Sequence, residues 1–274
     1  MKISVIIPTY NRAKTILEAI NSVLNQTVLP YEILICDDGS TDNTKDLVLG
    51  LSNPIVKWLE CGRNGRPAIP RNIGIKNATG DFIAFLDSDD VWHPDKLQVQ
   101  IDALTKSNCL AVCANAKRFI PSKGLEGNLL NLNKTTISFN DLLFANSIIC
   151  SSVIIEKKVF DKVYGFPEEP KFKAIEDYAL WLRILTLSNF AYIDEPLLNY
   201  TDDVVNSIRG VQALDNLYEI RLLVLENYIN WSEKAKINLS FLKKAKFHFW
   251  YYSKNKQNKL TIFDKIWFKL NKNL

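Results

Sequence analysis

The sequence has little of what marks fibrous, secreted or membrane-spanning proteins. Its 274 residues include only ten glycines and ten prolines, too few for a collagen-like chain or a long flexible linker. No run of about 18 apolar residues occurs, so we expect no membrane-spanning helix. The first apolar run, Ile3–Ile7, stops at Pro8 and is too short for a signal peptide. We therefore expect a cytoplasmic protein.

Residues that form disulfide frameworks and zinc sites are also scarce. The five cysteines are an odd number and form no Cys-x-x-Cys pair, so we expect free thiols in a reducing compartment. Cys109 and Cys113 could share a helix face, but the chain has only two histidines to complete a zinc site. We expect no zinc site.

What is present is an uneven charge. From Lys234 to Leu274 there are eleven lysines and one acid, Asp264, whereas the rest of the chain holds 23 basic and 29 acidic residues. The body is thus mildly acidic and the tail strongly basic, with aromatic residues between its lysines. Such a tail suits an anionic membrane surface or a helical bundle packed on the main domain, and both readings stay open. Nucleic-acid binding is not expected, because no nucleic-acid module accompanies the charge.

The first 115 residues alternate between apolar runs and segments with helical spacing. The apolar runs are Ile3–Ile7, Glu32–Cys36, Ile55–Leu59 and Phe82–Leu86, and the helical segments are Ala13–Leu24, 42–51, Pro70–Asn77 and Pro94–Leu104. This alternation predicts a parallel sheet with helices on both faces. Polar clusters follow three of the runs, at 9–11, 37–40 and 87–90. Ligands of such sheets bind at the carboxyl ends of the strands, so we expect these clusters to converge on one crevice.

The second half is less regular. We predict strands at Ala111–Ala114, Cys150–Ile155, Ala191–Ile193 and Leu197–Tyr200, helices at Lys157–Val163, Ile175–Leu187 and Leu214–Ile229, and a loop at 121–134.

Asp87 and Asp89 are candidates for a cation site. Alternate residues of an extended segment point the same way, and one or two carboxylates plus substrate phosphates commonly hold Mg²⁺ or Mn²⁺. The simpler reading is a pair of solvated turn residues. Asp38 is either part of an Asx turn before a helix or a hydrogen-bond acceptor for a nucleobase imide N–H.

Two further positions carry open alternatives. Arg71 is either a solvated residue at a helix start or a cation that offsets diphosphate charge. Glu176 and Asp177 begin a helix, where acids complement the helix dipole, but a carboxylate there could also act as a general base.

Taken together, these motifs resemble the family 2 glycosyltransferases. The resemblance covers roughly residues 1–210 and rests on the ordered set Pro8–Asn11, Asp37–Ser40, Asn64–Gly65, Arg71–Gly74, Asp87–Asp90 with Trp92, Pro94–Leu97, and Glu176–Asp177 with Trp181. It implies a GT-A fold, an α/β nucleotide-sugar-binding sandwich with a mostly parallel central sheet. The catalytic domain would span 1–212, with a nucleotide-sugar-binding half at 1–115 and an acceptor half at 116–212. A basic, aromatic helical region would follow at 213–274.

The resemblance also implies roles for individual residues. The uracil base would be held by Pro8, Tyr10 and Asp38, and Arg71 would lie on the base side or the diphosphate side. Asp87 would lie near the ribose and metal, and Asp89 would bind Mn²⁺ or Mg²⁺. Asp177 would be the catalytic base, with Glu176 and Trp181 on the acceptor side.

The function implied is inverting, metal-dependent transfer of a hexose or N-acetylhexosamine. The donor would be a UDP-sugar, and the acceptor a hydroxyl of a lipid-linked glycan in the synthesis of lipopolysaccharide, capsule or a related bacterial surface glycan. The enzyme would then work in the cytoplasm or peripherally at the inner face of the cell membrane. The alternatives are a metal-dependent nucleotide-sugar hydrolase and a non-catalytic nucleotide-sugar-binding protein.

Overall fold

The computed structural model describes residues 1–143, 145–203 and 217–237. Its strands are β1 (Ile3–Thr9), β2 (Glu32–Asp37), β3 (Val56–Glu60), β4 (Phe82–Phe85), β5 (Val91–Trp92), β6 (Ala111–Ile120), β7 (Gly124–Asn128), β8 (Thr136–Ile137), β9 (Ile154–Glu156) and β10 (Phe190–Thr201). Its α-helices are α1 (Ile16–Leu24), α2 (Thr44–Gly50), α3 (Ala68–Asn77), α4 (Lys96–Lys106), α5 (Phe139–Leu142), α6 (Val159–Val163), α7 (Glu176–Leu185) and α9 (Leu217–Lys234). Two short 3₁₀ helices are η1 (Cys150–Ser152) and η2 (Pro170–Phe172).

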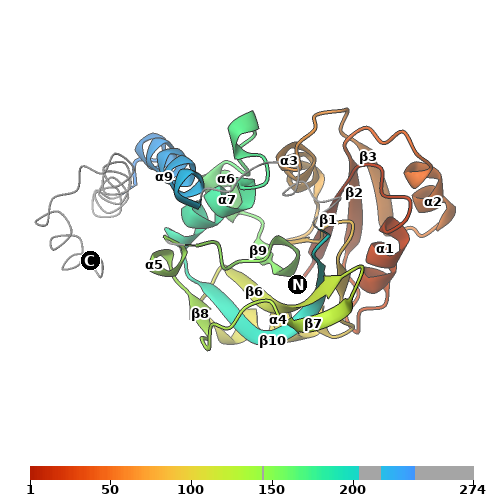
Figure 1. Cartoon of the computed structure of the whole chain (residues 1–274), viewed down its shortest axis with the longest axis horizontal. Coiled ribbons are helices and arrows are strands. Elements are labelled where there is room, and N and C mark those ends of the chain that lie inside the picture. Colours follow the sequence, from red (N-terminus) through yellow and green to blue (C-terminus); the bar gives the residue numbers. More distant parts are fainter. Residues whose placement is uncertain (144, 204–216, 238–274) are drawn as a thin grey trace, which may run out of the picture.

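The strands form one ten-stranded sheet with the order β3-β2-β1-β4-β9-β6-β10-β5, to which β7 and β8 pair at the side (Figure 1). The first four strands of this order pair in parallel, as the β-α alternation predicts. β10 also pairs in parallel with β6, whereas β9 runs antiparallel to both of its neighbours. The predicted α/β class with a mostly parallel central sheet is therefore confirmed.

The alternation of side chains along β1 explains why the sheet carries helices on both faces. Ile6 packs into one core with residues of α3, α6, α7 and α9. Val5 and Ile7 point to the other face and pack with residues of α1, α2 and α4. All three side chains are fully buried, as expected for a strand covered on both sides. Figure 1 shows the same division, with α1 and α2 on one side and the group α6, α7 and α9 on the other.

Three details of the second half differ from the sequence-based expectation. Residues 150–152 are a 3₁₀ helix rather than the start of a strand, because Ser152 bonds back to the Ile149 carbonyl with both its amide and its hydroxyl. The expected loop at 121–134 contains β7. The two strands expected at 191–193 and 197–200 are one strand, β10, whose register shifts on both sides of Pro196. Asp194 and Glu195 lie at the first of these shifts and are exposed.

Two helices begin later than predicted, and the carboxyl-terminal region is only partly described. α1 and α4 begin at Ile16 and Lys96, later than the predicted Ala13 and Pro94. The helix predicted at 214–229 corresponds to α9, which is described from Leu217 to Lys234. Residues 214–216 of the predicted helix lie outside the described part of the chain. Most of the basic region at 213–274 lies outside it too. No helix in the described ranges is long and apolar enough to cross a bilayer.

Candidate active site

A large cleft lies at the carboxyl ends of β1, β2 and β4. Its volume is about 1080 Å³. Eight of the nine residues predicted for the site line it, namely Pro8, Tyr10, Asp38, Arg71, Asp87, Asp89, Glu176 and Asp177. The expectation that the polar clusters converge on one crevice is therefore confirmed. The chemical roles assigned to these residues stay predictions.

Asp38 organises the loop that borders one end of the cleft. Its Oδ1 accepts a hydrogen bond from the Asn64 amide at 2.8 Å, and its Oδ2 accepts one from the Gly65 amide at 2.8 Å. Gly65 has a backbone φ of +73°, which residues other than glycine rarely adopt. The carboxylate, 5% exposed, is thus held in place by backbone groups and keeps a fixed position at the cleft wall.

Arg63 is a cleft residue that the sequence analysis did not identify. Its guanidinium pairs with Asp38 and lies 3.7 Å from the centroid of the Tyr10 ring. Tyr10 itself is 37% exposed. No motif or periodicity marks Arg63, because it lies in a loop and meets Tyr10 only through the fold.

The acidic turn at 87–90 is clamped by two distant segments. The Asp87 amide donates to the Ser151 hydroxyl at 3.0 Å, which ties the turn to η1. The Thr201 amide donates to Asp90 Oδ1 at 2.8 Å, which ties it to the end of β10. Burial and the charges of Asp89 and Asp87 raise the pKa of Asp90 well above its usual range. Asp90 is therefore a buried, structural member of the turn.

The residues present fit a divalent cation bound together with a substrate. The described ranges contain no group of three or more His, Cys, Asp or Glu side chains arranged as a metal site. The Asp89 side chain is 29% exposed to the cleft and lies 3.4 Å from Arg12. Burial and the nearby charge of Asp87 raise the pKa of Asp89, a cost that a bound cation relieves. Such a site suits Mg²⁺ or Mn²⁺ held by one or two carboxylates plus phosphates.

Arg71 connects the acidic turn with the opposite side of the cleft. The buried guanidinium donates to Asp87 Oδ1 and to Glu176 Oε1, both at 2.6 Å. Burial raises the pKa of Glu176 to about 7, against the lowering influence of Arg71 and together with the charge of Asp177. Arg71 therefore lies at the predicted place, but its charge is already shared between two carboxylates.

Asp177 stands at the start of α7 and is held from two directions. The Tyr178 amide donates to its Oδ1 at 2.7 Å, and the Asn146 side-chain amide donates to its Oδ2 at 3.2 Å. Asn146 Oδ1 in turn accepts from the Ile148 amide at 3.1 Å, which orients the side-chain NH₂ toward Asp177. Asn146 is a second residue that the sequence analysis did not identify, because its loop has no recognisable pattern.

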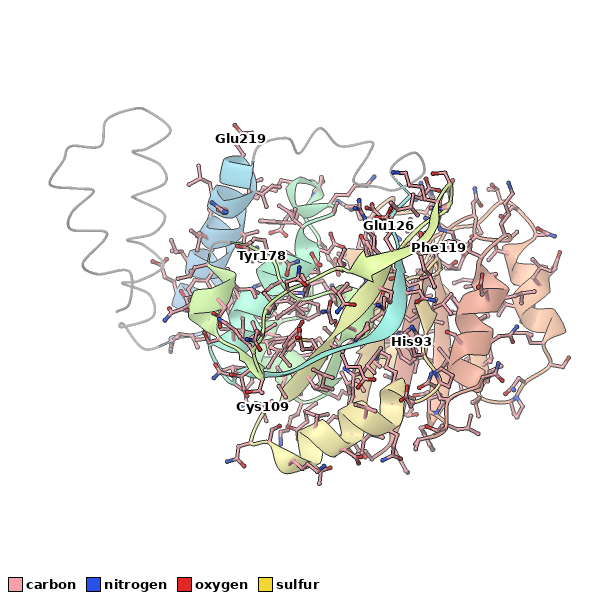
Figure 2. All side chains as sticks on the ribbon, turned by 60° about the horizontal axis from the view of Figure 1, so that its bottom comes forward. His93, Cys109, Phe119, Glu126, Tyr178 and Glu219 are labelled. Carbon is pink, nitrogen blue, oxygen red and sulfur yellow. The ribbon has the colours of Figure 1, made fainter. Side chains whose placement is uncertain are left out.

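Trp181 is not on the acceptor side of the cleft, which corrects that expectation. It is fully buried and packs edge-on against Phe166 and Phe190, with ring centroids 5.9 Å apart in each case. It lies one helical turn after Asp177, so it faces the core beneath the cleft. Tyr178, labelled in Figure 2, is likewise buried on α7 and donates from its hydroxyl to the Leu142 carbonyl.

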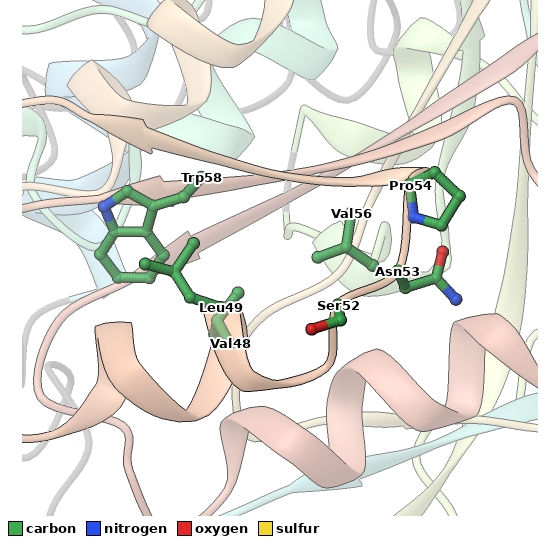
Figure 3. Close-up of a pocket in the computed structure, with 7 residues that line it drawn as sticks. All are labelled: Val48, Leu49, Ser52, Asn53, Pro54, Val56 and Trp58. Atoms are coloured by element: carbon green, nitrogen blue, oxygen red, sulfur yellow. The ribbon is translucent and has the colours of Figure 1, made fainter.

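A second, smaller pocket lies away from these residues. Its volume is about 210 Å³, and Figure 3 shows it between α2 and β3. It is lined by Val48, Leu49, Ser52, Asn53, Pro54, Val56 and Trp58. None of these side chains is charged, so this pocket offers no group for acid–base chemistry.

Known proteins resemble this chain in sequence and in structure. The family model described as glycosyl transferase family 2 matches residues 4–164. The chain is 38% identical over 192 residues to the UDP-Glc:alpha-D-GlcNAc-diphosphoundecaprenol beta-1,3-glucosyltransferase WfgD of Escherichia coli, a match that covers 70% of this chain and 73% of that protein. It is 33% identical over 184 residues to the UDP-Glc:alpha-D-GlcNAc-diphosphoundecaprenol beta-1,3-glucosyltransferase WfaP of Escherichia coli, a match that covers 67% of this chain and 70% of that protein.

A solved structure supports the fold. The crystal structure of S. aureus TarS 1-349 in complex with UDP-GlcNAc superposes with a TM-score of 0.72 at 23% identity, and covers 93% of this chain and 73% of that one. The GT-A type of fold expected from the sequence is therefore confirmed.

Proposed function

Because this chain belongs to glycosyl transferase family 2 and is a glycosyltransferase, we propose that it transfers a hexose or N-acetylhexosamine from a UDP-sugar to a glycan hydroxyl. The observation that carries the proposal is the convergence of Tyr10 and Asp38, Asp87 and Asp89, and Asp177 on one cleft. Such a transfer is served by an aromatic ring for the base, by carboxylates that could hold a cation beside the diphosphate, and by a carboxylate that accepts the acceptor's proton.

The donor is proposed to lie along the β1, β2 and β4 ends of the cleft. Tyr10 stacks on the uracil base, Asp38 accepts a hydrogen bond from its imide N–H, and Pro8 borders it. Asp87 lies near the ribose, and Arg71 is close enough to the acidic turn to offset diphosphate charge. Asp89 and Asp87 would hold Mn²⁺ or Mg²⁺, which when bound stabilises negative charge on the departing diphosphate.

Asp177 is proposed to act as the general base. An acceptor hydroxyl is a weak nucleophile at neutral pH, and Asp177 accepts its proton as the hydroxyl oxygen attacks the sugar carbon. The bond to the diphosphate breaks on the opposite side, so one displacement inverts the anomeric carbon. The hydrogen bonds from Asn146 and from the Tyr178 amide keep the carboxylate pointing into the cleft. Glu176 precedes Asp177 on the acceptor side of the cleft and is held there by its ion pair with Arg71.

The acceptor is proposed to be lipid-linked, as in the synthesis of lipopolysaccharide, capsule or a related surface glycan. The two Escherichia coli relatives are named for an acceptor attached to diphosphoundecaprenol, and they match most of this chain. An enzyme with such an acceptor works at the inner face of the cell membrane. The basic region from Lys234 would supply the contact with anionic lipid.

The test of the donor assignment is a binding screen. Purified protein is mixed with UDP-, GDP- and dTDP-sugars in the presence and absence of Mn²⁺, and its thermal unfolding is followed. A ligand at 100-fold its dissociation constant stabilises the folded state by about 2.7 kcal/mol. We expect stabilisation by UDP-sugars and only when the cation is present. Stabilisation by none of the nucleotides would contradict the proposal.

A further inference from the structure

Arg63 lies where the proposed function requires the nucleobase to bind. Its guanidinium is 3.7 Å from the centroid of the Tyr10 ring and pairs with the Asp38 carboxylate. Tyr10 and Asp38 are the two residues assigned to the base, one through its face and the other through its edge. The Arg63 guanidinium lies over the Tyr10 ring and pairs with Asp38, so it engages both of the groups that are assigned to the base.

This arrangement leaves no room for a base between Arg63 and Tyr10. A separation of 3.7 Å is the contact distance of two stacked planar groups, so a third planar group cannot enter between them. Arg63, Tyr10 and Asp38 all line the same cleft, so the covered face of the ring belongs to the donor site. We propose that Arg63 occupies the nucleobase position in the donor-free enzyme and that donor binding requires its guanidinium to leave the Tyr10 ring.

The surroundings of Arg63 allow the side chain to leave while its backbone stays. The side chain is 51% exposed, so its charge can be solvated in another rotamer. The backbone is packed against Gly39, where a Cβ would lie only 3.1 to 3.2 Å from the Arg63 backbone and Cβ. Asp38 keeps its hydrogen bonds from the Asn64 and Gly65 amides after the guanidinium leaves. The departure therefore exposes a prearranged acceptor for the base.

The exchange has a consequence for affinity. A half-exposed ion pair and a cation–π contact are each modest interactions, so the covered state is favoured but not locked. A donor binds only the fraction of molecules in which the ring is uncovered, and its apparent dissociation constant rises accordingly. Removal of the guanidinium should therefore tighten donor binding, although it also removes a positive charge from a site that takes an anionic ligand.

The experiment compares UDP binding to the unmodified full chain and to three variants of it by calorimetry with Mn²⁺ present. Arg63→Ala and Arg63→Gln remove the guanidinium, and Gln keeps part of the side chain in case Ala disturbs the loop. Arg66→Ala is the matched control, because Arg66 lines the same cleft from the same loop and makes no ion pair with the described residues. It reports the effect of losing one positive charge alone.

We expect both Arg63 variants to bind UDP about fivefold more tightly than the unmodified protein, and Arg66→Ala to bind no more tightly. Unchanged or weaker binding in both Arg63 variants would overturn the proposal, because it would make Arg63 a neutral or attractive part of the donor site. The inference rests on the proposed donor site, and the two can fail separately. If the unmodified protein binds no UDP, the donor assignment fails; if it binds UDP and the Arg63 variants bind no tighter, only the role of Arg63 fails.

Discussion

Asn146 is the residue that fixes the direction of the proposed base. Its amide oxygen is engaged by the Ile148 amide, so its NH₂ group has one orientation and donates to Asp177. Sequence reasoning named Asp177 as a candidate base, because Glu176–Asp177 belongs to the ordered motifs that resemble the family. It did not find Asn146 or Arg63, because both lie in loops and their partners are far away in the sequence. Such contacts are set by the tertiary fold and leave no local pattern.

Replacement of Asn146 should slow transfer without weakening donor binding. We expect Asn146→Ala to lower the turnover rate roughly 10-fold to 10²-fold, because a misplaced reacting group costs rates of that order. Asn146→Asp should be slower still, since it places a second carboxylate against Asp177. The measurement is steady-state turnover together with the dissociation constant for UDP.

The control for this pair is Asn131→Ala, which changes an exposed asparagine in the loop before β8. It should leave turnover and UDP binding unchanged. Normal turnover in both Asn146 variants would show that this side chain does not position the base.

Asp89 should carry the cation dependence of donor binding. Its carboxylate lines the cleft and lies 3.4 Å from Arg12, whereas Asp87 bonds to Arg71 at 2.6 Å and Asp90 is buried. We expect Asp89→Ala to remove the Mn²⁺-dependent part of UDP binding while the protein stays folded. Titration of UDP with and without Mn²⁺ measures this. Asp102→Ala, which changes an acid on the exposed face of α4, is the control. An unchanged response to Mn²⁺ in Asp89→Ala would place the cation elsewhere.

At the scale of elements, Glu32 joins the strands that carry the donor side of the cleft. It stands at the start of β2 and is 1% exposed. Its carboxylate accepts from the Ser4 hydroxyl of β1 at 2.7 Å, from Lys57 of β3 at 2.7 Å, and from the amide of Thr79 before β4 at 2.6 Å. Burial alone would raise the pKa of Glu32, but these hydrogen bonds outweigh it and lower the pKa to about 2.

Replacement of Glu32 should therefore destabilise the protein in a pH-dependent way. The folded-state pKa lies below the ordinary value of 4.5, so the stabilisation is full above that value and is lost as the pH falls toward 2. We expect Glu32→Gln to lower the free energy of unfolding by about 1–3 kcal/mol at pH 7. The difference from the unmodified protein should shrink below about pH 4.5.

Urea unfolding at pH 7, 5 and 3.5 measures this difference. The control is Glu60→Gln, since Glu60 is exposed and its pair with Lys45 should contribute little at any pH. A difference for Glu32→Gln that does not change with pH would show that the carboxylate charge is not what stabilises the strands.

The elements themselves were predictable where one physical signal was strong. Continuous apolar runs predicted β1, β2 and β4 because these strands are covered by helices on both faces. Prediction failed where local and tertiary forces compete. Residues 150–152 directly precede the apolar run Val153–Ile155, but the Ser152 hydroxyl bonds to the Ile149 carbonyl and favours a 3₁₀ turn. β10 appeared as two strands because an exposed acidic bulge interrupts its apolar pattern.

At the scale of the whole molecule, the proposed lipid-linked acceptor requires contact with a membrane. The basic region supplies about ten net positive charges from Lys234 onward, most of it outside the described part of the chain. Each basic residue near an anionic surface contributes about 1 kcal/mol to binding. We expect the protein to co-sediment with anionic liposomes at low salt, and to be released at 1 M salt, where the Debye length falls to about 3 Å.

Removal of residues 254–274 should weaken this binding, and neutral liposomes should retain little of the intact protein. If the intact protein ignores anionic liposomes at low salt, the basic region packs on the protein instead, and the acceptor reaches the cleft by another route.

The most direct test of the account is an analysis of reaction products with and without acceptor. Purified protein is incubated with a UDP-sugar, Mn²⁺ and a synthetic GlcNAc-diphosphate-lipid, and the lipid and the released sugar are both measured. We predict that the lipid gains one sugar and that little free sugar forms without it. Asp177→Asn should bind the donor normally and transfer at least about 10²-fold more slowly. Release of free sugar at the same rate with or without acceptor would identify a hydrolase and contradict the account.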